Sequence, residues 1–187
     1  MKLITGLGNP GKKFEDTRHN VGFLFLDILR EKFLYQKDIV VSDWEEEKIF
    51  MSDLSFVRRG TKIIAVLQKP LTYMNNSGDA VSKLIKKFDI TDIPNSFILV
   101  HDDLDIKLGK YKIQSGKAPI GHNGVNNVEE RLRGNDFKRI RIGIEARDNP
   151  NILGEDYVLM KFLPYEKEII EEVIHDAIRG ILADILI

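Results

Sequence analysis

The stretch Phe97-Ile98-Leu99-Val100-His101-Asp102-Asp103-Leu104-Asp105 joins four consecutive apolar residues to a histidine and a group of acids. An uninterrupted apolar run of this kind is typical of a strand buried on both faces, as in a parallel sheet covered by helices. Similar runs at residues 3–7 and 63–67 predict two more such strands. Residues 140–144 alternate in polarity and predict a further strand, in which we expect Arg141 to face outward.

Helical periodicity separates these predicted strands. Apolar residues recur every three or four positions from residue 21 to residue 29, with Asn20 as the expected N-cap. Further helical patterns follow around residues 80–88 and 125–132, and the longest follows Pro164. Strands that alternate with helices predict an α/β fold, with a mixed, largely parallel twisted β-sheet flanked by helices.

Three other segments complete the predicted order of elements. Residues 44–50 and 54–58 predict a hairpin that turns around Ser52-Asp53. Tyr111-Lys112-Ile113 predicts one more strand. Residues 146–157 are rich in Asp, Asn, Pro and Gly, which predicts a mobile surface loop.

The composition indicates a single cytoplasmic domain. The chain has 187 residues, and one domain over residues 1–187 is expected at this length. It contains no cysteine, which excludes a disulfide framework, a thiol nucleophile and thiolate metal sites. No apolar run approaches the ~20 residues of a membrane span. We therefore expect no interaction with membranes. We also expect a monomer, because an apolar face such as that of the long helix after Pro164 is more often core than subunit interface.

The charges are distributed unevenly along the chain. The formal net charge is −1, but residues 145–187 hold ten acids against four bases, which leaves the preceding part basic. A basic body can present a cationic face to phosphate groups. An acidic helix that is merely solvated is an equally good interpretation of the charge pattern alone.

A glycine-rich segment follows the first predicted strand. Gly6-Leu7-Gly8-Asn9-Pro10-Gly11 matches the G-x-G-x-x-G pattern of dinucleotide-binding proteins. In those proteins a helix begins inside the pattern, so that its N-terminus meets the pyrophosphate. Here helical periodicity begins only at Val21, and Asn9-Pro10-Gly11 itself indicates a turn. A tight turn is therefore favoured over a nucleotide site, which stays open as an alternative.

Polar side chains follow the predicted strands or precede the predicted helices at several other places. Asp16-Thr17-Arg18-His19-Asn20 precedes the first helix, Tyr73-Met74-Asn75-Asn76-Ser77-Gly78 the second, and Gly121-His122-Asn123-Gly124 the third. Capping is the ordinary role of an asparagine at such a position. An α/β fold can also gather these segments in one crevice at the carboxyl edge of its sheet.

The acids after residue 100 have two interpretations. Several carboxylates and a histidine could bind a metal, but Lys107 falls where an EF-hand loop needs an oxygen ligand. One carboxylate that orients a histidine explains the cluster more economically, with Asp103 and Asp105 as turn or surface acids. We therefore expect no metal. For His19, the positive end of the following helix lowers its basicity, whereas a carboxylate partner raises it.

These residue types suit hydrolysis without a covalent intermediate. The chain has no G-x-S-x-G elbow, no cysteine and no H-E-x-x-H, the usual carriers of covalent and zinc-dependent hydrolysis. A histidine with a carboxylate partner can deprotonate water, and amide side chains can stabilise an oxyanion. This chemistry is better suited to an ester than to an amide.

Five segments, taken together and in this order, resemble bacterial peptidyl-tRNA hydrolase. They are Gly8-Asn9-Pro10-Gly11, Thr17-Arg18-His19-Asn20, Met74-Asn75-Asn76-Ser77-Gly78, His101-Asp102-Asp103-Leu104-Asp105 and Gly121-His122-Asn123-Gly124. The resemblance covers essentially the whole chain. It implies hydrolysis, without a cofactor, of the ester between the peptide and the tRNA 3′ ribose, which recycles tRNA after premature termination of translation.

The resemblance also implies roles for individual residues. His19 is expected to be the base that activates water, and Asp102 the acid that holds and polarises this histidine. Asn9 and Asn75 are expected to contact the peptide and to place the reacting carbonyl. Asn123 is expected to help position the water and the ligand.

The tRNA acceptor stem and 3′ end have to be held by phosphate contacts, because such an enzyme serves every tRNA. Residues 105–141 hold nine bases against four acids. The resemblance implies that Lys112 and Arg141 contact the acceptor stem, and we also expect Phe14 among the binding residues. Lys117 is a candidate on charge alone, in a loop that is usually glycine-rich in the family and here contains Pro119.

Two alternatives of other classes remain. One is an RNA-binding module that binds tRNA without turnover, against which the presence of His19, Asp102 and Asn75 argues. The other is a nucleotide-dependent enzyme that uses residues 6–11, and a titration with NAD or ATP discriminates it.

Overall fold

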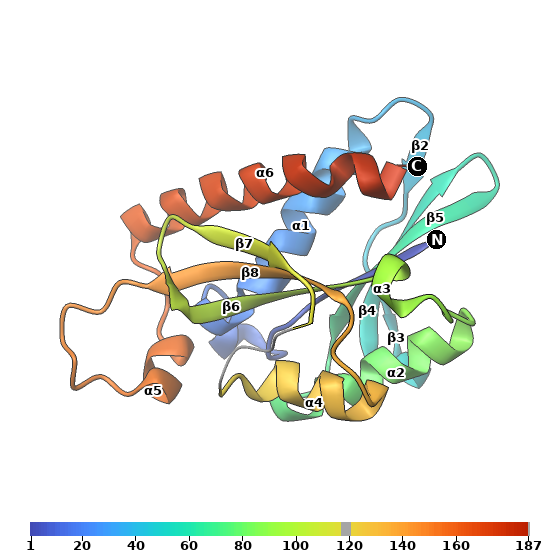
Figure 1. Cartoon of the computed structure of the whole chain (residues 1–187). Coiled ribbons are helices and arrows are strands. Elements are labelled where there is room, and N and C mark those ends of the chain that lie inside the picture. The colour runs from blue at the N-terminus through green and yellow to red at the C-terminus, as the bar shows by residue number, and fades with distance from the viewer. Residues whose placement is uncertain (117–120, 187) are drawn as a thin grey trace.

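A mixed β-sheet forms the centre of the molecule (Figure 1). A computed structural model of the chain describes residues 1–116 and 121–186, and within these residues the sheet has the order β2-β4-β5-β1-β6-β8-β7, with β3 paired to β4. The strands are β1 (Lys2–Gly6), β2 (Ile39–Val41), β3 (Glu45–Glu47), β4 (Ser52–Arg59), β5 (Lys62–Pro70), β6 (Phe97–Lys107), β7 (Tyr111–Gln114) and β8 (Lys138–Glu145).

The parallel strands lie in the middle of this sheet. β1 pairs in parallel with β5 and with β6, and β6 pairs in parallel with β8. Antiparallel strands flank them, β4 beside β5 and β7 beside β8. The predicted α/β class with a mixed, largely parallel sheet is confirmed.

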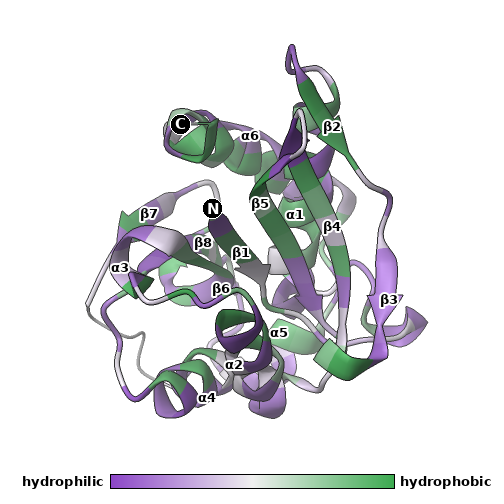
Figure 2. Ribbon diagram, turned by 90° about the vertical axis from the view of Figure 1, so that its right-hand side faces the viewer, coloured by the Kyte–Doolittle hydropathy of each residue, from purple (hydrophilic) through white to green (hydrophobic). Residues whose placement is uncertain are grey.

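Helices cover both faces of the sheet, as Figures 1 and 2 show. One face carries α1 (Val21–Leu34) and α6 (Pro164–Leu186), and the other carries α2 (Ser77–Lys87) and α4 (Asn123–Leu132). Two short helices, α3 (Ile93–Ser96) and α5 (Gly154–Leu159), complete the described elements. Within residues 1–116 and 121–186, no helix combines the length and the apolar character that a membrane crossing requires.

The apolar runs in the central strands occur because both faces of these strands are buried. Successive side chains of a strand point to opposite faces. In β1, Ile4 accordingly packs in the core beneath α1 and α6, and Leu3 packs in the core against α2 and α4. Neither side chain is exposed to solvent. Burial on both sides is the reason why residues 3–7 carry no charge, and the one polar side chain among them, Thr5, donates a hydrogen bond to Oε1 of Gln68 at 2.7 Å.

Several local predictions are corrected. The predicted strand at residues 97–100 continues to Lys107, so His101 and Asp102 lie within β6 rather than after it. The hairpin turns earlier than Ser52, because this side chain is buried in the sheet and its hydroxyl accepts a hydrogen bond from Gln68 Nε2 at 2.9 Å. Residues 146–157 are not wholly a loop, since the chain forms α5 from Gly154.

The first turn of α1 lies very close to the end of the central strands. A Cβ atom built on Gly22 would lie 2.4 Å from the backbone nitrogen of Leu7 and 2.7 Å from the carbonyl oxygen of Val100. Only a residue without a side chain allows this approach. It brings the segment before α1 against the carboxyl ends of β1 and β6.

We predict that Gly22→Ala destabilises the fold. The atoms that the new methyl group meets belong to the backbone, so the helix has to shift, and overpacking of this kind costs about 1–3 kcal/mol. The free energy of unfolding, measured with urea, is expected to fall by this amount. Gly134→Ala is the control: a Cβ there meets nothing within 4 Å, and the protein should be as stable as before or slightly more so. Equal stability of Gly22→Ala and the unsubstituted protein would contradict the close packing.

Candidate active site

A pocket of about 610 Å³ opens at the carboxyl ends of the parallel strands β1 and β6. Such an edge is where ligand sites gather in open α/β sheets. The pocket contains all five polar side chains that were expected to share one crevice: Asn9, His19, Asn75, Asp102 and Asn123.

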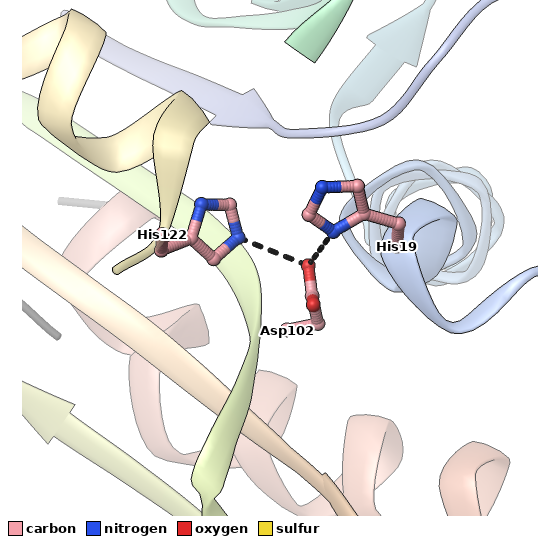
Figure 3. Close-up of side chains that lie close together, drawn as sticks. All are labelled: His19, Asp102 and His122. Atoms are coloured by element: carbon pink, nitrogen blue, oxygen red, sulfur yellow. Dashed lines mark hydrogen bonds and ion pairs between the residues drawn. The ribbon is translucent and has the colours of Figure 1, made fainter. Parts of the chain in front are cut away.

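The chemical centre of the pocket is a carboxylate shared by two imidazoles (Figure 3). Nδ1 of His19 lies 2.9 Å from Oδ1 of Asp102, and Nε2 of His122 lies 3.0 Å from the same oxygen. Each residue comes from a different element. His19 lies in the 3-10 turn Arg18–Asn20 before α1, Asp102 in β6, and His122 at the N-cap of α4.

The hydrogen bonds define which ring nitrogens carry protons. An ionised carboxylate only accepts, so His19 donates from Nδ1 and His122 donates from Nε2. Nδ1 of His122 accepts a hydrogen bond from the backbone N–H of Val125 at 3.3 Å, which agrees with a proton on Nε2. In neutral His19, Nε2 carries a lone pair and points away from the carboxylate (Figure 3). The His19 side chain is 13% exposed, so this nitrogen is available to a proton donor in the pocket.

The electrostatics of the cluster favour this arrangement. Burial lowers the pKa of His19, but the charge and the hydrogen bond of Asp102 outweigh burial and raise that pKa above its ordinary value. The expected raising effect of Asp102 on this pKa is present, but the lowering effect comes from burial and not from the end of the following helix. Burial by itself would raise the pKa of Asp102, whereas the two imidazoles hold that pKa well below its usual range. Asp102 is therefore ionised at neutral pH.

A third histidine lies beneath this cluster. His101 is fully buried, and its Nδ1 donates a hydrogen bond to the carbonyl oxygen of Asp102 at 2.7 Å. Its ring packs edge-on against that of His122, with 5.0 Å between the ring centroids. Burial and repulsion from His122 lower the pKa of His101 to about 3, so this ring stays neutral.

Among the described residues, the carboxylate and the two imidazoles that share it could also hold a metal ion. His19, Asp102 and His122 each offer one ligand atom, and these atoms lie within 4.8 Å of one another. In the structure these atoms are joined by hydrogen bonds through Oδ1 of Asp102. This pattern is that of a proton-handling site, in which a carboxylate orients a histidine.

The turn after β1 is fixed by reciprocal amide contacts. The backbone N–H of Asn9 donates to Oδ1 of Asn20, and Nδ2 of Asn20 donates to the carbonyl of Asn9, both at 2.9 Å. Asn20 therefore holds this turn. It occupies the N-cap position of α1 as predicted, but its side chain makes no capping hydrogen bond. Oδ1 of Asn9 accepts from the backbone N–H of Met74 at 2.8 Å. The group that Asn9 can offer to a ligand is its Nδ2.

The remaining walls of the pocket combine amides with apolar side chains. Asn75, in the 3-10 turn before α2, and Asn123, the first residue of α4, are both exposed in the pocket. The apolar side chains of Leu104, Val158 and Leu159 also line the pocket. The pocket thus offers both polar and apolar groups to a ligand.

An aromatic pair lies at the edge of the pocket. Phe14 contacts Tyr73 edge to face, with 6.4 Å between the ring centroids, and Tyr73 lines the pocket. Nζ of Lys13 lies 4.6 Å from the centroid of the Phe14 ring. The structure thus places Phe14 beside the pocket and makes it part of a surface with both aromatic and positive character.

Arg141 was predicted to face outward, but its side chain is held against the neighbouring strands. Its Nε donates to Oδ2 of Asp103 at 2.6 Å and its Nη1 to Oε1 of Gln114 at 2.7 Å, because the neighbouring strands β6 and β7 supply these acceptors. Asp103 is accordingly buried and is not a surface acid, whereas Asp105 is exposed as expected. Lys112 is exposed and pairs with Arg141 in the β7–β8 register.

Two residues of the site were missed by the sequence analysis, and one candidate lies outside the structure. His122 was passed over for Asn123, although a histidine between two glycines at the start of a helix was a usable signal. The structure gives the capping role to His122. Tyr73 was quoted in its segment but not singled out. Lys117 lies outside the described residues.

Comparisons with known proteins relate the chain to one family. The sequence model of a family described as Peptidyl-tRNA hydrolase matches residues 3–185. The peptidyl-tRNA hydrolase of Thermodesulfovibrio yellowstonii is 38% identical over 97% of this chain and 91% of its own length. That of Aquifex aeolicus is 39% identical over 97% of this chain and 88% of its own length. The crystal structure of peptidyl-tRNA hydrolase from Acinetobacter baumannii is similar with a TM-score of 0.84 and 29% identity, covering 100% of this chain and 89% of that one.

We predict that Asp102→Asn lowers the pKa of His19 below its ordinary value. The substitution removes the charge that raises this pKa and leaves the burial that lowers it. A titration of the histidine ring signals by NMR measures the change. Asp105→Asn, which removes a carboxylate from the same strand at an exposed position, should leave the pKa of His19 unchanged. An unaltered His19 pKa in Asp102→Asn would show that the carboxylate does not control this ring.

Proposed function

The chain belongs to the peptidyl-tRNA hydrolase family, and we propose that it hydrolyses the ester between the peptide and the tRNA 3′ ribose with His19 as the base. This reaction returns tRNA to translation after premature termination. The shared Asp102 carboxylate supports the proposal most directly. It fixes the proton on Nδ1 of His19 and leaves Nε2 free in a pocket.

His19 moves one proton in each half of the proposed reaction. Nε2 takes a proton from a water molecule while the water oxygen forms a bond to the ester carbonyl carbon. When the tetrahedral intermediate collapses, the bond between that carbon and the ribose oxygen breaks. The imidazolium then returns its proton to the ribose oxygen, which leaves a free hydroxyl on the tRNA and a carboxyl on the peptide. General base catalysis of this kind contributes about 10²–10⁴-fold.

Asp102 has two tasks in this scheme. Its hydrogen bond selects the tautomer of His19 that can act as a base at Nε2. Its charge stabilises the imidazolium that forms when His19 takes the proton, which agrees with the raised pKa of His19. His122 holds the same carboxylate oxygen from the other side and keeps it oriented.

The amides are suited to placing the substrate carbonyl. Nδ2 of Asn9 is the free donor of a side chain whose oxygen is already bonded to Met74. Asn75 and Asn123 face the same pocket and can donate to the oxyanion or hold the water. Loss of a true oxyanion donor typically costs ~10²–10³ in turnover.

Recognition of the tRNA is proposed to involve the side of the pocket that faces β7. Arg141 is held by Asp103 and Gln114, which fixes the direction of its remaining N–H donors toward a phosphate. Lys112 is exposed beside it and adds a mobile positive charge. Phe14 and Tyr73 offer ring surfaces for unpaired bases of the 3′ end.

We further propose that the chain acts in the cytoplasm, where translation supplies its substrate, as a monomer with one domain over residues 1–187. The apolar face of α6 supports this, because Ile170, Ile174, Ile178 and Ile181 are buried in the core of the same chain. Their burial explains this apolar face without a partner subunit.

We predict that His19→Ala abolishes release of peptide from N-blocked peptidyl-tRNA while binding of the tRNA persists. The expected loss is at least about 10²-fold, because the base is removed but the amides and basic residues are not. Turnover is measured in a buffer that contains EDTA, since the proposed reaction uses no metal. His175→Ala, on α6 outside the pocket, is the control and should retain activity. Retained activity in His19→Ala would remove this residue as the base, and tRNA binding without turnover by the unsubstituted protein would favour an RNA-binding module.

We predict that Arg141→Gln combined with Asp103→Asn raises the KM for peptidyl-tRNA more than it changes kcat. Replacing both residues avoids leaving a buried carboxylate without its partner. Loss of one phosphate contact should also reduce the dependence of KM on salt concentration. Lys62→Gln, at the opposite end of the parallel strands, is the control. A KM that does not change in the double variant would exclude Arg141 from tRNA binding.

A further inference from the structure

Arg18, the residue before His19, has a buried side chain that reaches a distant part of the chain. Its Nη1 donates to the carbonyl oxygens of Met160 at 3.1 Å and Lys161 at 2.8 Å. Its Nη2 donates to Oε2 of Glu166 at 2.6 Å, and both side chains of this ion pair are 3% exposed. One planar guanidinium therefore bonds three acceptors, all of them in the segment from the end of α5 to the first turn of α6.

Aromatic rings enclose the same guanidinium. Its central carbon lies 4.1 Å from the ring centroid of Tyr157 and 5.3 Å from that of Phe162. The Tyr157 hydroxyl in turn donates to the carbonyl of Ile144 at the end of β8. Stacking between two rings restricts a guanidinium in a way that a lysine ammonium cannot match.

The carboxylate of Glu166 has a second hydrogen-bond partner besides Arg18. Its Oε2 also accepts a hydrogen bond from the backbone N–H of Leu163 at 2.8 Å. The two segments are joined by backbone hydrogen bonds as well, from Arg18 N–H to the Met160 carbonyl and from Phe162 N–H to the Asp16 carbonyl, both at 3.1 Å. The turn that carries His19 is thus attached to the segment 157–166 at several points.

We propose that Arg18 and Glu166 are positioning residues that set the place of His19 against Asp102. This inference rests on the proposed function of His19 as the base. Arg18 and His19 are neighbours in one 3-10 turn, so the anchor of the first determines where the second projects. The segment that Arg18 holds also includes Val158, which lines the pocket. The ion pair between Arg18 and Glu166 therefore connects the turn that carries His19 to a segment that lines the pocket.

Stability alone does not account for a buried ion pair of this kind. Removing two charges from water is costly, and replacing such a pair by uncharged residues of similar volume is often neutral or stabilising. Removal of one partner, in contrast, leaves an uncompensated buried charge. A variant without either charge can therefore separate positioning from stability.

The main test is the double variant Arg18→Met, Glu166→Gln. Gln at position 166 retains an oxygen that can accept from the N–H of Leu163. The unfolding free energy is expected to stay near that of the unsubstituted protein, while kcat falls at least about tenfold and KM changes less, since small misplacement of a catalytic group can cost ~10²-fold. The pKa of His19 should also fall, because its contact with Asp102 loosens, and the acidic limb of kcat/KM then moves to lower pH.

A second variant, Arg18→Lys, keeps the positive charge beside Glu166 but lacks the fork that bonds two carbonyls at once. It should change kcat and the His19 pKa in the same direction as the double variant. Lys167→Met is the matched control, because Lys167 forms the exposed ion pair with Asp16 between the same two segments. Exposed pairs of this kind contribute little, so all readouts should stay unchanged.

The outcomes separate this proposal from the proposed function. NMR titration of His19 needs no substrate, so it decides the positioning role even if the unsubstituted protein shows no hydrolysis. Folded variants with an unaltered kcat and an unaltered His19 titration would overturn the proposal. Loss of the folded state in both Arg18 variants would overturn it too, since the pair would then be required for stability itself. If the double variant alone fails to fold, Arg18→Lys decides.

Discussion

One buried carboxylate oxygen imposes the main constraint on this structure. Oδ1 of Asp102 accepts hydrogen bonds from His19 and from His122, while the Asp102 side chain is only 2% exposed. A carboxylate removed from water in this way stays ionised only if N–H donors replace its hydration. Its two donors come from segments 83 residues earlier and 20 residues later in the chain. The fold has to bring these segments within hydrogen-bonding distance, or the charge at the centre of the site is unsupported.

The architecture meets this requirement with rigid elements. β6 carries Asp102 to the carboxyl edge of the sheet, where parallel strands end together. Gly22 allows α1 to approach the ends of β1 and β6, and so the turn with His19 comes within reach of Asp102. On the other side, His122 caps α4 through Nδ1 and bonds Asp102 through Nε2, so one ring serves the helix and the site. His19, the proposed base, is thus positioned by packing that is complete without a substrate.

The sequence was most informative where a residue pattern reports a single physical constraint. The central strands were predicted because burial on both faces demands apolar residues at every position. The polar segments of the site were predicted because glycines, asparagines and histidines interrupt that pattern. The sequence did not predict the turn of the hairpin, the strand β2 or the helix α5, because contacts with distant residues determine such elements. The hydroxyl of Ser52, for example, bonds Gln68 inside the sheet, and the hydroxyl of Tyr157 in α5 donates to the carbonyl of Ile144. His122 was missed for a related reason, because an asparagine next to it is the commoner capping residue and the partner of the histidine lies on another element.

The burial of Asp103 changes how the surface of the site has to be understood. A free arginine on β8 would attract RNA by charge, but Arg141 is paired with Asp103 and bonded to Gln114, which reduces the net charge at this place and fixes the direction of the Arg141 side chain. Under the proposed function, attraction over long distances would then depend on exposed bases such as Lys112, whereas Arg141 would contribute geometry. In the register of β6 and β8, Arg141 lies opposite His101, the residue before Asp102. The strand pair that holds Asp102, the proposed catalytic carboxylate, therefore also holds the arginine proposed to contact the tRNA. Under this proposal, a phosphate bound there would be placed at a fixed distance from His19, which would allow an enzyme that does not read base sequence to position every tRNA in the same way.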